Sequence, residues 1–233
     1  MFNFYSRWSL PRQLSVSALL SVVLAISIFL LVVSIVFYKE INQVSDTHQV
    51  KEVSLIASQL EARFEAIMQM THTLSAVLNN EFKDIDVNPN KTIKIGSIDS
   101  PLVSLSGETL NLNYKKIDQF TQATGATATI FVRDGDDFLR ATTSLKKENG
   151  NRAIGTYLGK QHPGYQALIS GQAYVGKAFL FNKNYMTKYL PLVKAGKTIA
   201  ILYIGVAYDD ILDEINHSLG KLTFGSSGYV FIT

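Results

Sequence analysis

The chain has 233 residues, of which 47% are hydrophobic, 11% aromatic and 18% charged, with a formal net charge of +3. The aromatic content and the small net charge exclude an intrinsically disordered chain, and the scattered basic residues give no indication of nucleic-acid binding. Because the sequence contains no cysteine, a disulfide scaffold, a thiolate metal site and a cysteine nucleophile are also excluded.

The first element in the chain is an uncharged apolar run over residues 14–38. At about 1.5 Å per residue, a helix of this length is longer than the hydrocarbon core of a bilayer, which is about 30 Å thick. The apolar region of a cleaved signal peptide is shorter, about 7–15 residues, and ends in small residues. This run ends in valine, phenylalanine and tyrosine, so it predicts a retained transmembrane helix.

The charges beside this run predict its orientation. Arg7 and Arg12 precede the run, and no acidic residue does, whereas basic and acidic residues are mixed after it. Lys and Arg are in excess on the cytoplasmic side of membrane proteins. We therefore expect residues 1–13 in the cytoplasm and residues 39–233 outside it, in a periplasmic or extracellular position.

Residues 39–83 are predicted to form one long helix outside the membrane. Neither proline nor glycine interrupts residues 41–80, and apolar residues recur there at helical spacing. This stripe indicates that one face of the helix packs against a domain, and a dimer-forming stalk that transmits motion is the alternative. The stripe consists of Val53, Ile56, Leu60, Phe64, Ile67, Leu74 and Val77.

The pattern then changes to short strands, which predict a sensor lobe over residues 84–208. Turn-forming residues are frequent between residues 84 and 107, and a helix is expected over 112–123, ended by Gly125. A long N-terminal helix followed by antiparallel strands gives the fold class α+β. The remaining expected elements are strands at 126–133 and 137–145, a short helix around 162–170, and strands at 173–182, 185–193 and 198–208.

The last segment, residues 209–233, repeats the order of an earlier one. A helix over 209–222 and a strand over 225–233, separated by glycine, match the helix, glycine and strand of residues 118–132. An apolar strand at the end of a chain has no partner to pair with. We therefore expect a second, similar lobe to begin here, and the chain to be an N-terminal fragment.

The sequence contains no convincing catalytic or metal-binding set. Gly196-Lys197-Thr198 lacks the earlier glycine of a phosphate-binding loop, because Pro191 stands in its place. The four histidines are dispersed, and the acidic turn at Asp134 lacks the glutamate of a calcium loop. The chain is thus predicted not to be an enzyme and to need neither a cofactor nor a metal.

A ligand pocket remains as the candidate site. Arg140, Thr142 and Ser144 alternate along one predicted strand and would share a face of the sheet. A guanidinium group, hydroxyls and aromatic rings suit a small carboxylate. The alternative is that Arg140 and Lys177 are solvated residues on an outer face.

Six segments between residues 102 and 206 resemble the Cache sensor family: TGATATIFV, DFLRATTSL, RAIGTYLG, HPGY, YMTKYLPL and ILYIGV. More narrowly, their combination with the membrane span and the long helix is similar to the fused double-Cache type, a Cache-three/Cache-two fusion, of bacterial methyl-accepting chemotaxis proteins. The resemblance implies a PAS-like antiparallel sheet outside the membrane, with a ligand between the sheet and its covering loops. Carried over by position, Arg140, Thr142 and Ser144 would face the pocket. Its rim or lid would consist of Arg152, Tyr165, Lys177, Phe179 and Tyr185.

The function implied by this resemblance is the ligand-sensing part of a bacterial transmembrane chemoreceptor in the inner (plasma) membrane. The expected partners are a small organic ligand, either a carboxylate or an amino acid, and a second copy of the chain in a parallel homodimer. The same sequence would also suit the sensor region of a membrane histidine kinase or of a cyclic-dinucleotide enzyme.

Overall fold

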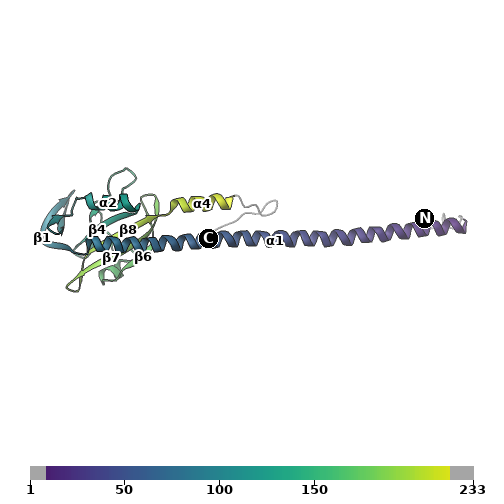
Figure 1. Cartoon of the computed structure of the whole chain (residues 1–233), viewed down its shortest axis with the longest axis horizontal. Coiled ribbons are helices and arrows are strands. Elements are labelled where there is room, and N and C mark those ends of the chain that lie inside the picture. Colours follow the sequence, from purple (N-terminus) through teal and green to yellow (C-terminus); the bar gives the residue numbers. More distant parts are fainter. Residues whose placement is uncertain (1–8, 221–233) are drawn as a thin grey trace. The chain divides into compact units, whose positions relative to one another are not determined.

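The first element of the chain is a single long helix, α1, which extends over Leu10–Phe82 (Figure 1). The structure, a computed structural model, describes residues 9–220, apart from the side chains of residues 41–50, 52 and 218–220. Contacts between residues divide the chain into two units, Met1–Gln59 and Leu60–Thr233, and α1 contributes to both. The expectation that the apolar run and the stripe after it form one helix is confirmed.

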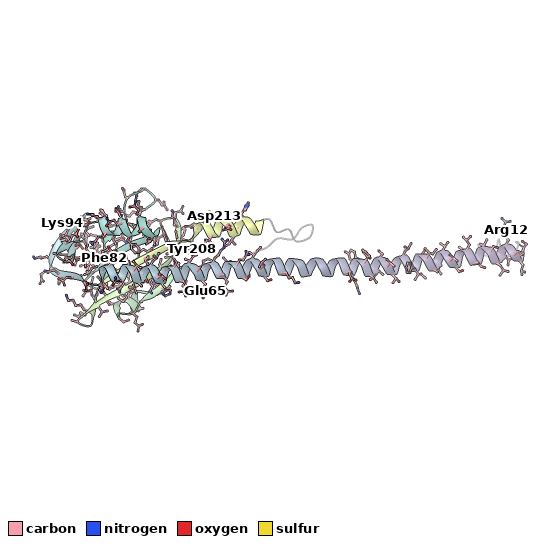
Figure 2. All side chains as sticks on the ribbon, in the orientation of Figure 1. Arg12, Glu65, Phe82, Lys94, Tyr208 and Asp213 are labelled. Atoms are coloured by element: carbon pink, nitrogen blue, oxygen red, sulfur yellow. The ribbon has the colours of Figure 1, made fainter. Side chains whose placement is uncertain are left out.

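In the first unit, the stretch Leu10–Glu40 carries exposed side chains on all sides of the helix (Figure 2). The most apolar 18-residue window of this stretch has a mean hydropathy of 3.1, and none of that window is buried within the protein. In the described part of the chain, this is the one helix that is long and apolar enough to span a membrane. The stretch contains the run that the sequence predicts to be transmembrane.

In the second unit, the C-terminal part of α1 packs against strands through one face. The hydroxyls of Thr71 and Ser75 on this face donate to carbonyl oxygens one turn earlier in α1, at 2.8 and 2.7 Å, so their burial leaves no polar group unpaired. Val77, which the stripe predicts to be buried, is 51% exposed, because the adjacent Leu78 takes the buried position. The buried face consists of Ile67, Thr71, Ser75, Leu78 and Phe82.

A small antiparallel sheet follows α1. β1 (Ile85–Ile95) and β2 (Ile98–Leu105) form a hairpin, and the short β3 (Glu108–Thr109) pairs with β2. α2 (Lys115–Thr124) comes next and ends at Gly125, whose φ of 73° is a left-handed conformation that glycine adopts readily. The helix expected over 112–123 is therefore confirmed.

The main sheet has five antiparallel strands in the order β5-β4-β8-β7-β6. β4, the first of these strands in the chain, lies inside the sheet between β5 and β8. The predicted α+β class with a PAS-like antiparallel sheet is confirmed. The elements are β4 (Thr127–Asp134), β5 (Asp137–Thr143), α3 (Tyr165–Ile169), β6 (Tyr174–Leu180), β7 (Lys183–Lys194) and β8 (Lys197–Ala207).

α4 (Asp209–Gly220) is the last element that the structure describes. The Asp209 carboxylate accepts hydrogen bonds from the backbone N–H (3.0 Å) and the side-chain amide (2.7 Å) of Asn184, which joins the start of α4 to β7. Just before α4, the ring of Tyr208 packs edge-on against Phe64 of α1, with 5.3 Å between centroids. The helix predicted over 209–222 agrees with α4, whereas the predicted strand over 225–233 lies outside the described residues.

The two faces of the five-stranded sheet are covered by different elements. One face, which we call the helix-facing side, packs against α1 and α2 and includes Ile130, Leu202 and Ile204. The opposite face, the loop-facing side, packs against residues 153–172, which we call the covering segment. Because side chains alternate along a strand, neighbours such as Leu202 and Tyr203 lie on opposite sides. The buried residues of the loop-facing cluster are Phe131, Phe138, Leu168, Tyr189, Ile201 and Tyr203.

Candidate functional site

A β-bulge between β4 and β5 determines which side chains of β5 reach the loop-facing side. Phe131 pairs with Arg140, whereas the preceding Ile130 pairs with Thr142, so β5 contains one extra residue, Ala141, at this point. Arg140 therefore shares the loop-facing side with Phe131. Thr142 lies with Ile130 on the helix-facing side.

The expectation that Arg140, Thr142 and Ser144 share one face is wrong, because the bulge shifts the alternation by one residue. The Thr142 hydroxyl donates to the Asn113 carbonyl oxygen at 2.9 Å, just before α2. The Ser144 hydroxyl is 2.7 Å from that of Thr121, which lies on α2. Both hydroxyls thus hold α2 on the sheet, on the side opposite Arg140.

Arg140 is a buried cation with an incomplete set of partners. Its side chain is 8% exposed, and its guanidinium carbon lies 4.9 Å from the centroid of the Phe131 ring. Nη1 donates to the carbonyl oxygen of Ala153 (3.1 Å) and to the hydroxyl of Thr156 (2.8 Å) in the covering segment. Nε has no hydrogen-bond partner among the described residues. Burial lowers the pKa of Arg140, but a guanidinium remains charged in proteins.

Two buried tyrosines belong to the same loop-facing cluster as Phe131, the ring that Arg140 covers. The rings of Tyr189 on β7 and Tyr203 on β8 are 5.0 Å apart between centroids. Burial raises the pKa of Tyr189 to about 12 and that of Tyr203 further, so both phenols stay protonated and can donate hydrogen bonds. The Tyr203 hydroxyl is buried and lacks a partner in the part of the chain that the structure describes.

His162 of the covering segment extends this aromatic group. Its ring centroid is 4.7 Å from that of Tyr189 and 5.4 Å from that of Tyr174 on β6. Nδ1 accepts the backbone N–H of Gly164 at 3.1 Å, so the neutral imidazole carries its proton on Nε2. Burial lowers the pKa of His162, which favours this neutral form.

The covering segment is fixed to the sheet by hydrogen bonds at several points. The Leu158 N–H donates to the Phe138 carbonyl oxygen at 2.9 Å, and Thr198 on β8 donates its hydroxyl proton to the Leu168 carbonyl oxygen at 2.8 Å. The buried Tyr165 donates its hydroxyl proton to the carbonyl oxygen of Asp136. These bonds hold a lid over Arg140 and the tyrosines, and this lid and the sheet enclose the candidate site.

The profile of the Cache 3/Cache 2 fusion domain matches residues 35–233. The chain belongs to the Cache 3/Cache 2 fusion domain family. No curated protein sequence matches the chain. The predicted resemblance to the Cache sensor family is thereby confirmed. Cache domains are extracellular modules that sense small molecules and are not catalytic. Together with the apolar N-terminal helix, the family indicates a membrane protein.

The Cache sheet places three of the predicted pocket residues away from Arg140. Arg152 forms a two-pronged ion pair with Asp118 of α2, both contacts at 2.7 Å, and its guanidinium carbon lies 4.2 Å from the ring centroid of Tyr114. Lys177 and Phe179 on β6 alternate with the loop-facing residues and lie on the helix-facing side. Lys177 there holds its ammonium nitrogen 4.6 Å from the ring centroid of Phe64 on α1.

Two other predicted residues do lie near Arg140's side of the Cache sheet. Tyr185 is buried, and it pairs with Ala207 of β8. It is two positions from Thr187 and four from Tyr189 along β7, so the three side chains share one face. Tyr165 belongs to the covering segment. The prediction that these residues bind a ligand remains a prediction.

The sequence argument missed Tyr189, Tyr203, His162 and Tyr174. The first two could have been found: Tyr189 is in alternation with the predicted Tyr185, and Tyr203 is the one residue with a hydroxyl between Ile199 and Ala207. His162 and Tyr174 lie where the covering segment meets β6, and no spacing in the sequence brings them to Arg140.

Proposed function

We propose that the chain is the ligand-sensing part of a bacterial transmembrane chemoreceptor, with residues 1–13 in the cytoplasm and the Cache domain outside it. The family, the apolar helix and the positively charged residues Arg7 and Arg12, which precede the uncharged run over residues 14–38, support this proposal. The main evidence for a ligand site is the environment of Arg140. Its guanidinium group is buried, its Nε has no hydrogen-bond partner, and it forms no ion pair among the described residues.

The proposed ligand is a small organic molecule that supplies the missing negative charge. A buried cation without a counter-ion is unfavourable, so an anionic group that enters the site gains a charge-assisted hydrogen bond from Arg140 Nε. The Tyr203 hydroxyl, also unpartnered, is the second donor of the proposed site. Tyr189 and His162 add aromatic surface around it.

The proposed signal passes through the sheet to α1. The ligand contacts the loop-facing side and the covering segment, while the helix-facing side packs against residues 60–82 of α1. Because α1 is one continuous helix from Leu10, a displacement of this part can be passed along it. A ligand shifts α1 only if it binds one arrangement of sheet and helix more tightly than the other.

The test is ligand-induced stabilisation of the purified full chain in detergent micelles, with a panel of small organic anions. We expect at least one anion to raise the Tm, and Arg140→Gln to weaken its binding by about 30-fold or more. Lys177→Gln, on the helix-facing side, is the matched control and should leave the affinity unchanged.

Two further results separate a ligand role for Arg140 from a structural one. Arg140→Gln loses the Nη1 hydrogen bonds to Ala153 and Thr156, so its Tm without ligand should fall, whereas its affinity, titrated well below that Tm, reports on the ligand contact alone. Arg140→Lys, which keeps the charge but not the planar donors, should bind the anion with intermediate affinity. Unchanged affinity in Arg140→Gln would contradict the proposed site. In the native host, Arg140→Gln should also abolish the swimming response to the ligand. A receptor whose output is a kinase or a cyclase would not produce such a swimming response.

A further inference from the structure

We propose that the ligand is a carboxylate without an ammonium group, so that the site takes small organic acids and excludes amino acids. The inference rests on the proposed function and concerns the same site. It follows from which charges and which hydrogen-bond acceptors lie on the loop-facing side.

The first argument is the absence of a negative charge facing Arg140. Along β4, β7 and β8, most positions on Arg140's face carry hydroxyl, aromatic or aliphatic side chains or glycine, and the other ionised groups there are Arg133 at the end of β4 and Lys183 at the start of β7. Arg133 holds its guanidinium carbon 5.9 Å from the Phe138 ring centroid and donates to carbonyl oxygens. The charged side chains that these strands place on this face, within the described residues, are therefore all cations: Arg133, Arg140 and Lys183.

The acidic side chains at the two ends of the main sheet are hydrogen-bonded to other groups. Asp134 accepts a hydrogen bond from the Tyr157 hydroxyl, and Asp137 accepts the Gly159 N–H at 3.1 Å, both at the β4–β5 turn. Asp209 at the other end of the sheet is bound to Asn184. An ammonium group placed beside Arg140 would meet a like charge and no carboxylate, which disfavours its charged form.

The second argument is the shortage of free acceptors. An ammonium group has three donors and needs acceptors, whereas a carboxylate needs donors. The Ala153 carbonyl oxygen and the Thr156 hydroxyl, the acceptors next to Arg140, are already used by its Nη1. The free groups are Arg140 Nε, which only donates, and the Tyr203 hydroxyl, which can donate or accept. Together they offer a carboxylate two donors, whereas they offer an ammonium group one acceptor for its three donors.

The aromatic rings do not replace the missing carboxylate. A cage of aromatic faces can bind an ammonium group, but here the rings pack edge to face: the His162 ring lies at 63° to that of Tyr189 and at 78° to that of Tyr174. Phe131 is already covered by Arg140 itself. This edge-to-face packing closes the ring faces that a cation would need.

The test compares matched pairs of acids that differ only by the amino group. The full chain in detergent micelles is titrated with propionate and alanine, succinate and aspartate, and 3-phenylpropionate and phenylalanine. In the pair whose acid binds the chain, we expect the acid to bind about 100-fold more tightly than the matching amino acid, because the ammonium group of the amino acid would be buried without a partner. An amino acid that binds as tightly as its acid, and loses that affinity in Arg140→Gln, would overturn this inference while leaving the proposed site intact.

A gain-of-function variant gives a second readout. Thr187→Asp adds a carboxylate on the loop-facing side, opposite Gly205, and should narrow the preference for the acid over the amino acid. The control is Lys188→Asp at the next position, which lies on the helix-facing side and should leave the preference as in the wild type. If no acid and no amino acid stabilises the wild-type chain, the proposed function itself is contradicted, which is a different result from binding of the amino acids.

Discussion

His162 is the titratable residue of the covering segment whose charge bears most directly on the candidate site. Burial lowers its pKa below the ordinary value of 6.5, so the unfolded chain binds this proton more readily than the folded chain. Stability is therefore lost as the pH falls below 6.5 toward the lower folded pKa. His162→Phe should reduce the fall in Tm between pH 7 and pH 5. The exposed His217→Phe is the control, and an undiminished fall in His162→Phe would contradict this account.

At Gly164, the backbone of the covering segment lies directly against the side chain of Tyr174 on β6. A Cβ at position 164 would overlap Cγ of Tyr174, whose ring passes over the backbone. Gly164→Ala is expected to destabilise the fold by about 1–3 kcal/mol, as overpacking of a core does. Urea unfolding measures this cost. In a Tyr174→Ala background the same glycine substitution should cost little, and an unchanged cost there would show that the overlap is not its cause.

At this scale the sequence predicted the central residue of the site but not its neighbours. Arg140 was selected because a guanidinium group beside hydroxyls on a predicted strand suits a small carboxylate, and in the structure it lies on the loop-facing side. Thr142 and Ser144 followed from strict alternation, which the bulge at Ala141 breaks. A bulge depends on how two strands pair, and no local pattern in β5 indicates it.

At the scale of elements, a polar contact joins α1 to the sheet. The ammonium nitrogen of Lys188 on β7 lies 2.9 Å from Nδ1 of His72 on α1, and since an ammonium group only donates, Nδ1 is the acceptor. Burial lowers the pKa of Lys188, which has no carboxylate partner among the described ion pairs.

His72→Leu should therefore destabilise the fold by about 1–3 kcal/mol, because it leaves the Lys188 ammonium group unpaired. Lys188→Met in the same chain should recover most of that loss, because an apolar pair can replace a buried polar one. Equilibrium unfolding in urea of both single variants and the double variant measures the coupling. Additive effects of the two substitutions would show that the contact contributes nothing.

The elements themselves were largely predictable, whereas the faces they cover were not. Periodicity predicted α1, α2, α4 and the five strands of the main sheet because hydrophobic spacing is a local property. It could not tell which side of β6 packs against α1, so Lys177 and Phe179 were assigned to the pocket, although they lie on the helix-facing side. In the same way, Val77 and Leu78 are adjacent and both apolar, and only the packing of α1 against the strands determines that Leu78 is the buried one.

At the scale of the whole molecule, family membership was predictable because several motifs of one family occur in the expected order over residues 102–206. The sequence also indicated the apolar helix, whose length and composition need no tertiary information. The second lobe predicted from residues 209–233 is a different case. Its helix agrees with α4, but its strand lies outside the described residues, so the repeat remains a prediction.

The predicted parallel homodimer concerns the surface of α1. Met70 and Val77 are seven residues apart, share one face of the helix, and are 43% and 51% exposed. Apolar residues at heptad spacing on an exposed helix face are typical of positions that meet in a parallel pair of helices. We therefore expect α1 of one copy to contact α1 of another through this face.

Val77→Glu should weaken the dimer by about tenfold or more, because a parallel pair would bring two carboxylates together. Sedimentation of the full chain in detergent, over a range of protein concentrations, measures the change. Val193→Glu on β7 is the control, since Val193 is 52% exposed and belongs to the main sheet and not to the exposed face of α1. The ligand affinity of Val77→Glu should stay within twofold of the wild type, roughly the limit for a surface substitution outside the site. If both variants shift the equilibrium equally, the exposed face of α1 is not the contact, and the signal would then have to reach the membrane through a single copy of the helix.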